Sequence, residues 1–562
     1  MNAAWLWRIA AATGMVAFLL GGPAWAFRQE AQPVSGEARR AFEQLTGSAP
    51  EERAAAFDFL LKSKSGALVP ALEAFRNGLL ERRSDGTLVI YRSRVEINGS
   101  KVFPLVDAWT LNPLTDAAGA PAYADSLGSS MLKSEDADEQ NLARLISILS
   151  LYHPDPDIRR EAIADAANRG DADMLDDLKA ALENNPGSAL TSTLRESIAR
   201  IELTHGAGDV RLNAARTLGE LGTSGGLDDL RKVLDEAKSS NDTPLTTAIE
   251  SAIARIDSYQ LKVRILKYTF SGLSLGSILV LLALGLSIIF GLMRVINLAH
   301  GEFMMVGAYT TYVVAEFFKL HVPAAWFDYY YILALPLAFL VSGLVGWICE
   351  ATIIRHLYGR TIETLLATWG ISLVLIQTAR LLFGDTTSLT PPNWFQGGWE
   401  VAPDLVFPLN RLFIIAFCGV CVAVVYYLVQ GTRFGLLLRA TTQDRPIAAA
   451  LGVPTRWMDG MTFGFGTGLA GLAGATVPLF DKLNPNIGQG YIVDSFMVVV
   501  VGGVGKLIGA ITAGMSLGFL TQYVEPWLGA IYGKLAVLGL IIVFLQRRPS
   551  GLFPHRGRAA ED

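Results

Sequence analysis

The chain changes character near Leu261. Before this point it is polar and rich in helix-forming residues. After it, long apolar runs follow one another to residue 546, and charged residues are confined to short gaps. Runs of about 20 apolar residues match the ~30 Å hydrocarbon thickness of a bilayer. The second part is therefore predicted to be a polytopic membrane domain, and the overall hydrophobic fraction of 51% averages over two different halves.

The composition argues against several other classes of protein. The formal net charge is −5, and the chain has no basic stripe of the kind that binds nucleic acid. The sequence contains no recognisable nucleophile–base pair, metal-ligand set or phosphate-binding loop, so we expect no enzymatic activity, cofactor or metal. Cys418-Gly-Val-Cys421 has the spacing of a redox motif, but it lies inside an apolar run. These cysteines are interpreted as buried helix residues.

The first residues have the form of an export signal. An apolar core covers residues 9–22, and Ala-Trp-Ala at 24–26 supplies a small-x-small cleavage site. Residues 1–26 are therefore predicted to be a signal peptide, with an uncleaved N-terminal anchor as the alternative. In both cases residues 27–258 would be exported.

Residues 27–258 contain two segments that are alike at a spacing of 52 residues. Asp-Ile-Arg-Arg-Glu-Ala at 157–162 corresponds to Asp-Val-Arg-Leu-Asn-Ala at 209–214, and Leu-Asp-Asp-Leu recurs at 175 and 227. Each unit is predicted to form three helices with a Gly-containing turn, a pattern that resembles HEAT-type solenoid repeats. Residues 35–82 are also expected to be helical, and the alternation near 87–103 predicts a small β-rich insert.

Charge bias predicts the orientation of the apolar runs. Arg433, Arg439, Arg445 and Arg456 share one gap, and the tail after the last run is also basic. Since positive residues favour the cytoplasmic side, the first span should run inward and the N-terminal domain should lie in the periplasm. The run near 491–505 is short and ends in glycines, which is typical of a broken or re-entrant helix. The expected spans are 266–293, 303–318, 329–354, 362–383, 408–430, 458–480, 491–505, 507–524 and 527–546.

The basic gap at 432–457 holds the clearest mechanistic signal. A short helix is expected after Asp444 and Arg445, with Pro446 in its first turn and Gly452 as its C-terminal cap. Its three alanines would present a small face for close packing. Such a helix, projecting from a bilayer, suits docking into a groove of another protein. The alternative is a basic amphipathic loop at the membrane surface.

These residues also carry a family resemblance. Ala-Ala-Ala-Leu-Gly at 448–452 resembles the EAA-type coupling loop of ABC importer permeases, although Ile447 precedes the alanines where that motif has a leading Glu. The stretch from Asn297 to Tyr309, with His300-Gly-Glu302 inside it, resembles the signature of branched-chain amino-acid-type permeases. Within that family, the N-terminal extension and the loop that begins at Gly384 look most like the urea permease subunits.

The resemblance covers about residues 266–553. It implies that 259–553 is the transmembrane domain of an ABC importer, that 554–562 is a cytoplasmic tail, and that the chain lies in the bacterial inner membrane without an ATPase site of its own. The implied partners are a second permease subunit, two ATP-binding cassette subunits, an extracytoplasmic substrate-binding protein and membrane lipid. The residues that would form the ATPase-coupling loop are Arg439, Asp444, Arg445, Ala448, Ala449, Ala450 and Gly452.

Polar residues inside spans are costly and are therefore candidates for a substrate pathway. Urea is small and neutral and offers one acceptor and four N–H donors, which amide, hydroxyl and carboxylate groups would suit. The alternative for each residue is that it caps a helix or ties two spans together. The candidates are Asn297, His300, Glu302, Thr368, Gln377 and Asp494.

Two other functions stay open. A permease for branched-chain amino acids or short amides should need a cation or a helix N-terminus for a substrate carboxylate. A passive solute channel with an exported sensory domain would transport without ATPases and tolerate loss of 448–452. The expected fold class is all-α: a polytopic α-helical membrane protein of about 8–9 spans, one of them broken or re-entrant, with an N-terminal extracytoplasmic HEAT-like repeat domain.

Overall fold

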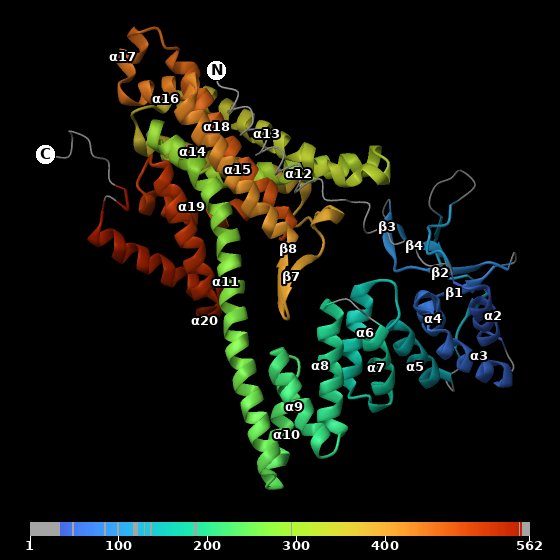
Figure 1. Cartoon of the computed structure of the whole chain (residues 1–562). Helices are drawn as coiled ribbons and strands as arrows, with labels where there is room; N and C mark the ends of the chain where they lie inside the picture. Colours follow the sequence, from blue (N-terminus) through green and yellow to red (C-terminus); the bar gives the residue numbers. More distant parts are fainter. Residues whose placement is uncertain are drawn as a thin grey trace, which may run out of the picture. The chain divides into compact units, whose positions relative to one another are not determined.

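The computed structural model describes residues 34–553, apart from gaps at 48–49, 84–85, 98–99, 116–121, 129, 135–137, 185–187, 294 and 550 (Figure 1). The predicted signal peptide and the predicted tail 554–562 lie outside the described residues. The described residues form two compact units that divide between Leu261 and Lys262. The division coincides with the change of character in the sequence. We call the two units the N-terminal domain and the membrane domain.

The N-terminal domain begins with three helices, α2 (Gly36–Leu45), α3 (Pro50–Ser63) and α4 (Val69–Arg76). Ser35 caps α2, because its hydroxyl accepts a hydrogen bond from the backbone N–H of Ala38. The apolar faces of the helices meet in a core that contains Phe42, Leu60 and Leu72, each fully buried. Residues 35–82 are thus largely helical, as the sequence predicts.

An antiparallel sheet follows, larger than the insert expected at 87–103. Its described strands have the order β3-β4-β2-β1-β6, and β5, outside this path, also pairs with β4. Tyr91 and Phe103 pack edge to face between β2 and β4, with ring centroids 5.8 Å apart. The short strands outside 87–103 show no alternation of apolar and polar residues, and they form only by pairing with neighbouring strands. The strands are β1 (Leu80–Arg82), β2 (Leu88–Tyr91), β3 (Val95–Ile97), β4 (Ser100–Asp107), β5 (Tyr123–Ala124) and β6 (Met131–Leu132).

Helices form the rest of the domain, and the two similar segments have the same order of helices. In each, a helix ends at a glycine with positive φ, Gly170 in the first and Gly222 in the second, and the next helix begins at Leu-Asp-Asp-Leu. The classification of these units as HEAT-like stays a prediction. The helices are α5 (Glu139–Ser150), α6 (Pro156–Arg169), α7 (Leu175–Asn184), α8 (Ser188–His205), α9 (Asp209–Leu221), α10 (Leu227–Ser239) and the start of α11 (Thr243–Met293).

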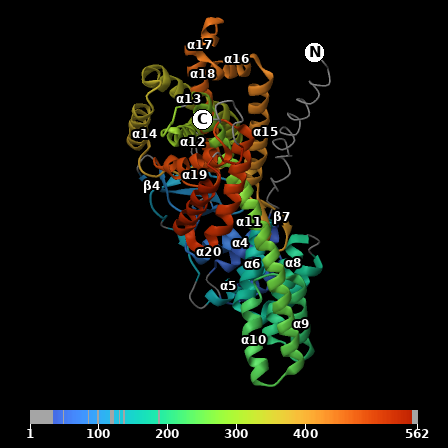
Figure 2. The ribbon, with the colours of Figure 1, turned by 90° about the vertical axis from the view of Figure 1, so that its left-hand side faces the viewer.

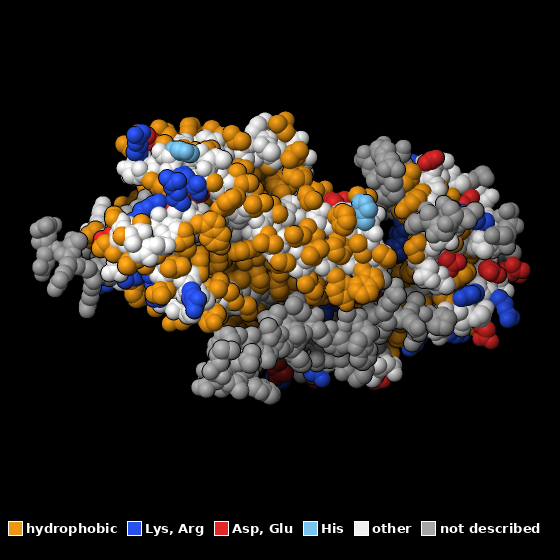
Figure 3. Space-filling model, turned by 90° about the horizontal axis from the view of Figure 1, so that it is seen from above, with side chains coloured by type: hydrophobic (Ala, Val, Ile, Leu, Met, Phe, Trp, Pro, Cys, Tyr) orange, Lys and Arg blue, Asp and Glu red, His pale blue; other side chains and the backbone are white. Residues whose placement is uncertain are grey.

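The membrane domain is helical, with one β-hairpin of strands β7 (Gly398–Ala402) and β8 (Leu405–Pro408). Among the described residues, five helices are long and apolar enough to cross a membrane, and α19 is a shorter apolar helix. Hydrophobic side chains cover much of the face seen in Figure 3. After α11, the helices are α12 (His300–His321), α13 (Tyr330–Thr352), α14 (Thr361–Phe383), α15 (Leu409–Gly431), α16 (Arg433–Gln443), α17 (Arg445–Ala450), α18 (Thr455–Thr476), α19 (Ile487–Gly502) and α20 (Leu507–Arg547).

Helices α12, α13 and α18 pack together at the centre through glycine. A Cβ atom on Gly307 of α12 would fall on the carbonyl oxygen of Gly471 in α18, and one on Gly464 would lie 2.9 Å from the carbonyl oxygen of Gly343 in α13. Backbones approach this closely only where the side chain is a hydrogen atom. Glycine and threonine make α18 less apolar than the spans around it, and nearly all of its middle and final turns are buried within the bundle.

The run predicted as broken or re-entrant forms a helical hairpin. Helix α19 ends at Gly502, and α20 begins at Leu507 after a turn in which Gly503 and Gly505 have positive φ. Gly502 packs on the backbone of Gly509. The longer helix α20 has a non-helical residue at Gly529, after Pro526, so that it consists of two helical parts. This break lies close to the boundary predicted between the last two spans.

The two ends of the membrane domain differ. Helices α16 and α17 lie at one end, and the β7–β8 hairpin lies towards the other (Figures 1 and 2). Near the hairpin, the hydroxyl of Tyr331 donates to the carbonyl of Ala475 at 3.0 Å, and the amide of Asn410 donates to the carbonyl of Leu479 at 2.8 Å. Helix α18 therefore runs from the α16–α17 end to the hairpin end.

Candidate functional site

The polar stretch before α12 lies inside the bundle. Nε2 of His300 lies 3.0 Å from the carbonyl oxygen of Leu282 in α11. Leu282 is about 16 Å before the end of α11 at Met293, at ~1.5 Å per residue. The chain therefore turns back along α11 before α12 begins. Gly301 packs against the backbone of Gly488 near the start of α19, so two helix N-termini meet there.

Asn297 and Thr368 form the first part of a polar cluster. The Asn297 side-chain oxygen accepts the backbone N–H of Ala299 at 3.1 Å, while its Nδ2 is buried without a partner. The hydroxyl of Thr368 accepts the backbone N–H of Leu298 at 3.2 Å and donates to the carbonyl of Leu365 at 2.9 Å. Helix α14 therefore holds the turn and leaves one amide donor of Asn297 unused.

Glu302 and Ser372 form the second part of the cluster. Glu302 is 2% exposed, and its Oε2 is buried without a partner. Ser372 lies within hydrogen-bonding reach of the same carboxyl group. Because Thr368 and Ser372 are one turn apart on the buried face of α14, both parts of the cluster lie along the same face. The cluster thus offers one unused donor and one unused acceptor.

The other three predicted pathway residues lie elsewhere. His300 is fully buried, and it ties the start of α12 to α11. Gln377 is exposed, whereas the face of α14 that carries Thr368 is buried, so the structure does not bring Gln377 to the cluster. Asp494 in α19 forms an ion pair with Lys534 in α20, with Oδ2 and Nζ 3.5 Å apart.

Helix α17 forms where the sequence predicts it. The Asp444 carboxylate caps the helix by accepting the backbone N–H of Ile447 at 3.0 Å, and Pro446 occupies the first turn. At the other end Gly452 has φ of +85°, its N–H donates to the carbonyl of Ala449, and the N–H of Val453 donates to the carbonyl of Ala448. These caps define six helical residues at the tip of the domain.

The two faces of α17 differ. Ala448 is 3% exposed and packs inward, whereas Ala449 and Ala450 are exposed. Ile447 and Leu451 are large apolar residues with 58% and 80% of their surface exposed. Arg439, on the preceding helix α16, donates to the side-chain oxygen of Gln430 at 2.7 Å. An exposed apolar surface on so short a helix is typical of a protein contact.

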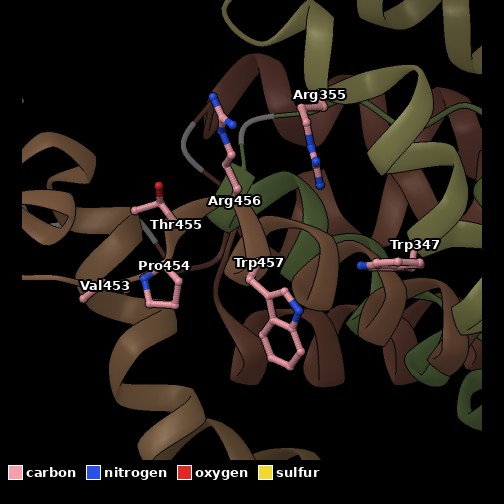
Figure 4. A pocket seen from close by; sticks show the side chains of 7 residues that line it. All are labelled: Trp347, Arg355, Val453, Pro454, Thr455, Arg456 and Trp457. Atoms are coloured by element: carbon pink, nitrogen blue, oxygen red, sulfur yellow. The ribbon is translucent and has the colours of Figure 1, made fainter.

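A hollow lies beside this helix. It has a volume of about 510 Å³ and opens between the end of α13 and the link from α17 to α18. Figure 4 shows the side chains of Arg355, Arg456 and Trp457 around it, with Trp347 of α13 on the far side. Trp457 is 59% exposed. The hollow adds cationic and aromatic groups to the surface next to α17.

Several residues that the sequence analysis did not single out belong to these two places. At the α17 end of the membrane domain, Arg445 pairs with Asp459 of α18, and Glu350 of α13 pairs with Arg355. Burial raises the pKa of Tyr358 well above its usual value, so Tyr358 stays a hydrogen-bond donor. The spacing of Thr368 and Ser372 on one helix face was the only sequence signal for Ser372.

Comparison with known proteins assigns the membrane domain. A family model described as "Branched-chain amino acid transport system / permease component" matches residues 268–545. Through this domain, the chain belongs to the branched-chain amino-acid-type ABC permease family. It is therefore an ABC permease, which agrees with the resemblance of the stretch from Asn297 to Tyr309 and of 448–452.

Relatives in this permease family share the membrane domain. The high-affinity branched-chain amino acid transport system permease protein LivH of Escherichia coli (strain K12) is 26% identical over 298 residues, which are 51% of this chain and 94% of the relative. BraD of Pseudomonas aeruginosa is 26% identical over 301 residues, which are 51% of this chain and 95% of the relative. LivM of E. coli (strain K12) is 22% identical and covers 50% of this chain and 69% of its own length. No solved structure matches the chain.

Proposed function

We propose that this chain is the permease subunit of an ATP-driven importer for urea in the bacterial inner membrane. It would form the substrate pathway with a second permease subunit and dock two ATP-binding cassette subunits through α16 and α17. A substrate-binding protein would deliver urea on the opposite side of the membrane. The N-terminal domain would lie on that side, in the periplasm, as a HEAT-like surface for protein contacts.

The observation that carries the proposal is the capped, half-exposed helix α17. Its ends are fixed by Asp444 and Gly452, and its outer face shows Ile447, Ala449, Ala450 and Leu451 to a partner. A passive channel has no need for such a helix. The relatives belong to transport systems with more than one permease protein, since LivH and LivM both match this chain. This favours a pathway shared with a second permease.

The polar cluster supports a small neutral amide as the substrate. The unused Nδ2 of Asn297 can donate to the oxygen of urea, and the unused Oε2 of Glu302 can accept one of its N–H groups. Both atoms are buried, where leaving a polar group unpaired costs about 1–3 kcal/mol. Hydrogen bonds from a substrate to both groups therefore contribute more binding free energy than the same hydrogen bonds would in water.

A branched-chain amino acid is the second candidate, because the relatives are named for that transport. Its ammonium group would suit Glu302. Its carboxylate would need a cation or a helix N-terminus, and the N-termini of α12 and α19 meet at Gly301 and Gly488. We place urea first because it can pair both unused groups of the cluster, the Nδ2 of Asn297 and the Oε2 of Glu302.

Uptake of labelled urea and leucine by cells with and without this chain tests the proposal. We expect urea uptake to be lost and leucine uptake to be kept. Glu302→Gln should raise the KM for urea about tenfold, because it removes a charge-assisted hydrogen bond. Glu316→Gln on the same helix changes a partly exposed residue paired with Lys319 and should transport normally. Loss of leucine uptake with intact urea uptake would exclude urea as the substrate.

A further inference from the structure

Two acidic residues are buried at the α17 end of the membrane domain. Glu350, in the last turn of α13, has a fully buried side chain, and Asp459, in the second turn of α18, has a side chain that is 8% exposed. Each has its own arginine: Nη2 of Arg355 lies 3.0 Å from Oε2 of Glu350, and Nη2 of Arg445 contacts Oδ2 of Asp459. Buried carboxylates need such partners, because desolvation of an unpaired charge is very costly.

Arg445 is the first residue of α17, and it attaches that helix to the rest of the domain. Besides its ion pair with Asp459, its guanidinium lies over the ring of Tyr358, 5.1 Å from the centroid. The hydroxyl of Tyr358 donates to Oε1 of Glu350 at 2.8 Å. One side chain of α17 therefore reaches α18 directly and α13 through Tyr358. Ala448 is the buried residue of the helix, and its small side chain has no polar atom to fix a position.

Helix α18 is in turn locked to its neighbours through backbone contacts. A Cβ atom on Gly460, next to Asp459, would lie 2.7 Å from the ring of Trp347 in α13. Further along, Gly471 packs on Gly307 of α12, and Gly474 packs on the backbone at Met304. Since glycine faces cannot adjust through side-chain rotamers, a displacement of α18 must carry α12 and α13 with it. Helix α12 bears Glu302.

We propose that the Arg445–Asp459 ion pair transmits the movement of α17 to α18, and through α18 to the polar cluster on α12. This inference rests on the proposed function, because it assigns a route between the ATPase contact and the substrate site. Arg445 acts as a positioning residue: it holds α17 in register with the α12–α13–α18 core. The pair Glu350–Arg355 keeps the Tyr358 ring in place beneath it.

The test uses the complete importer, with both permeases, the ATPases and the binding protein, in proteoliposomes. Arg445→Gln and Asp459→Asn should each lower urea uptake at least tenfold. In Asp459→Asn, which changes a residue of α18 outside the coupling loop, basal ATP hydrolysis should stay within twofold of wild type. Stimulation of ATP hydrolysis by the loaded binding protein should be lost. The double variant should be no worse than either single variant, since both remove the same link. Arg360→Gln removes an exposed arginine paired with Glu363 and should behave as wild type.

Other outcomes decide against the inference. The inference would be overturned if Arg445→Gln and Asp459→Asn each took up urea within twofold of wild type. It would also be overturned if the two losses of uptake multiplied in the double variant. If Arg445→Gln does not assemble with the ATPases, Arg445→Lys decides: it keeps the cation and should retain at least a third of the uptake, whereas uptake at background level would overturn the inference. A wild-type complex that assembles but takes up urea without ATP hydrolysis would overturn the proposed function as well.

Discussion

Nε2 of His300 donates a hydrogen bond to the backbone carbonyl of Leu282, 3.0 Å away. This contact joins the first residue of α12 to α11 about three turns before the end of α11, and it keeps the intervening turn inside the bundle. The turn holds Asn297 close to α14, and α12 then places Glu302 near Ser372. The polar cluster therefore depends on a contact that does not involve any of its own members.

Replacing His300 should destabilise the membrane domain. His300→Ala removes the hydrogen bond to Leu282 and leaves a cavity beside Gly285, for an expected cost of about 2 kcal/mol or more. Thermal unfolding of the purified protein in detergent measures the loss as a lower midpoint. His321→Ala, at the exposed end of the same helix, should leave the midpoint unchanged. Equal effects of both variants would contradict the role of the buried contact.

A methyl group at the centre of the glycine contact should also be costly. Gly307→Ala puts a Cβ atom on the carbonyl oxygen of Gly471, so α12 and α18 must separate, and overpacking of this kind costs about 1–3 kcal/mol. Gly419→Ala in α15 is the matched control, because a Cβ atom there has no neighbour within 4 Å. The comparison needs only the unfolding midpoints of the two variants. A smaller shift for Gly307→Ala than for Gly419→Ala would refute the packing argument.

Gly452→Arg should uncouple transport from ATP hydrolysis. Gly452 has φ of +85°, which an L-residue adopts at a cost of about 1–2 kcal/mol, so the cap of α17 should be distorted. Gly452→Asn should be milder, because Asn tolerates this conformation better. Gly384→Arg also puts an L-residue at positive φ, at the end of α14 where φ is +78° and ψ is −165°, and should leave coupling intact. The ratio of urea transported to ATP hydrolysed reports the result, and an unchanged ratio in Gly452→Arg would count against α17 as the coupling helix.

The N-terminal domain should lose stability as the pH falls below about 6.5, the usual pKa of histidine. Burial lowers the pKa of His153, and its Nδ1 accepts the backbone N–H of Asp155 at 3.0 Å, which only the neutral ring can do. As the pH falls, the unfolded chain therefore takes up a proton on His153 before the folded domain does. The contribution of His153 to the free energy of unfolding is complete above pH 6.5. Below that pH it declines, by at most about 1.4 kcal/mol per pH unit.

Hydrogen exchange of α5 and α6 in the full-length protein, corrected for intrinsic rates, measures this effect. Protection should fall between pH 7 and pH 5 in the wild type. In His153→Asn it should depend less on pH, because Asn can accept the same hydrogen bond without titrating. His205→Asn replaces an exposed histidine and should keep the wild-type dependence. A wild-type profile without a slope would exclude the assignment to His153.

The sequence predicted most of the helices because bilayer spans and helix caps are local signals. Asp444, Pro446 and Gly452 act on residues within one or two turns, so the bounds of α17 follow from the sequence. The same is true of the turn between Gly502 and Leu507. The sheet of the N-terminal domain was underestimated, since β6 forms through pairing with β1, and β1 through pairing with β2 and β6, and not from their own residues.

The residues that form the polar cluster could not be predicted from local sequence. Asn297, Glu302 and Thr368 come together because His300 folds the chain back, and nothing in the periodicity of α14 separates Gln377 from Thr368 until the buried face is known. The ion pairs at the α17 end join residues that are only 5 and 14 positions apart, Glu350 with Arg355 and Arg445 with Asp459. The contact of Arg445 with the ring of Tyr358, which links α17 to α13, joins more distant residues. That contact depends on tertiary packing, and a single sequence carries no signal for it.

The glycine face of α18 has a consequence for how selectivity can change in this permease. Positions such as Gly464, Gly471 and Gly474 cannot accept a larger side chain while the helices stay in contact, so the central layer offers no room for a new binding group. Helix α14 is different, because it reaches the cluster through the side chains of Thr368 and Ser372 and not through its backbone. A change of substrate is therefore easiest to engineer at these two positions, where one side chain can be exchanged for another of similar volume.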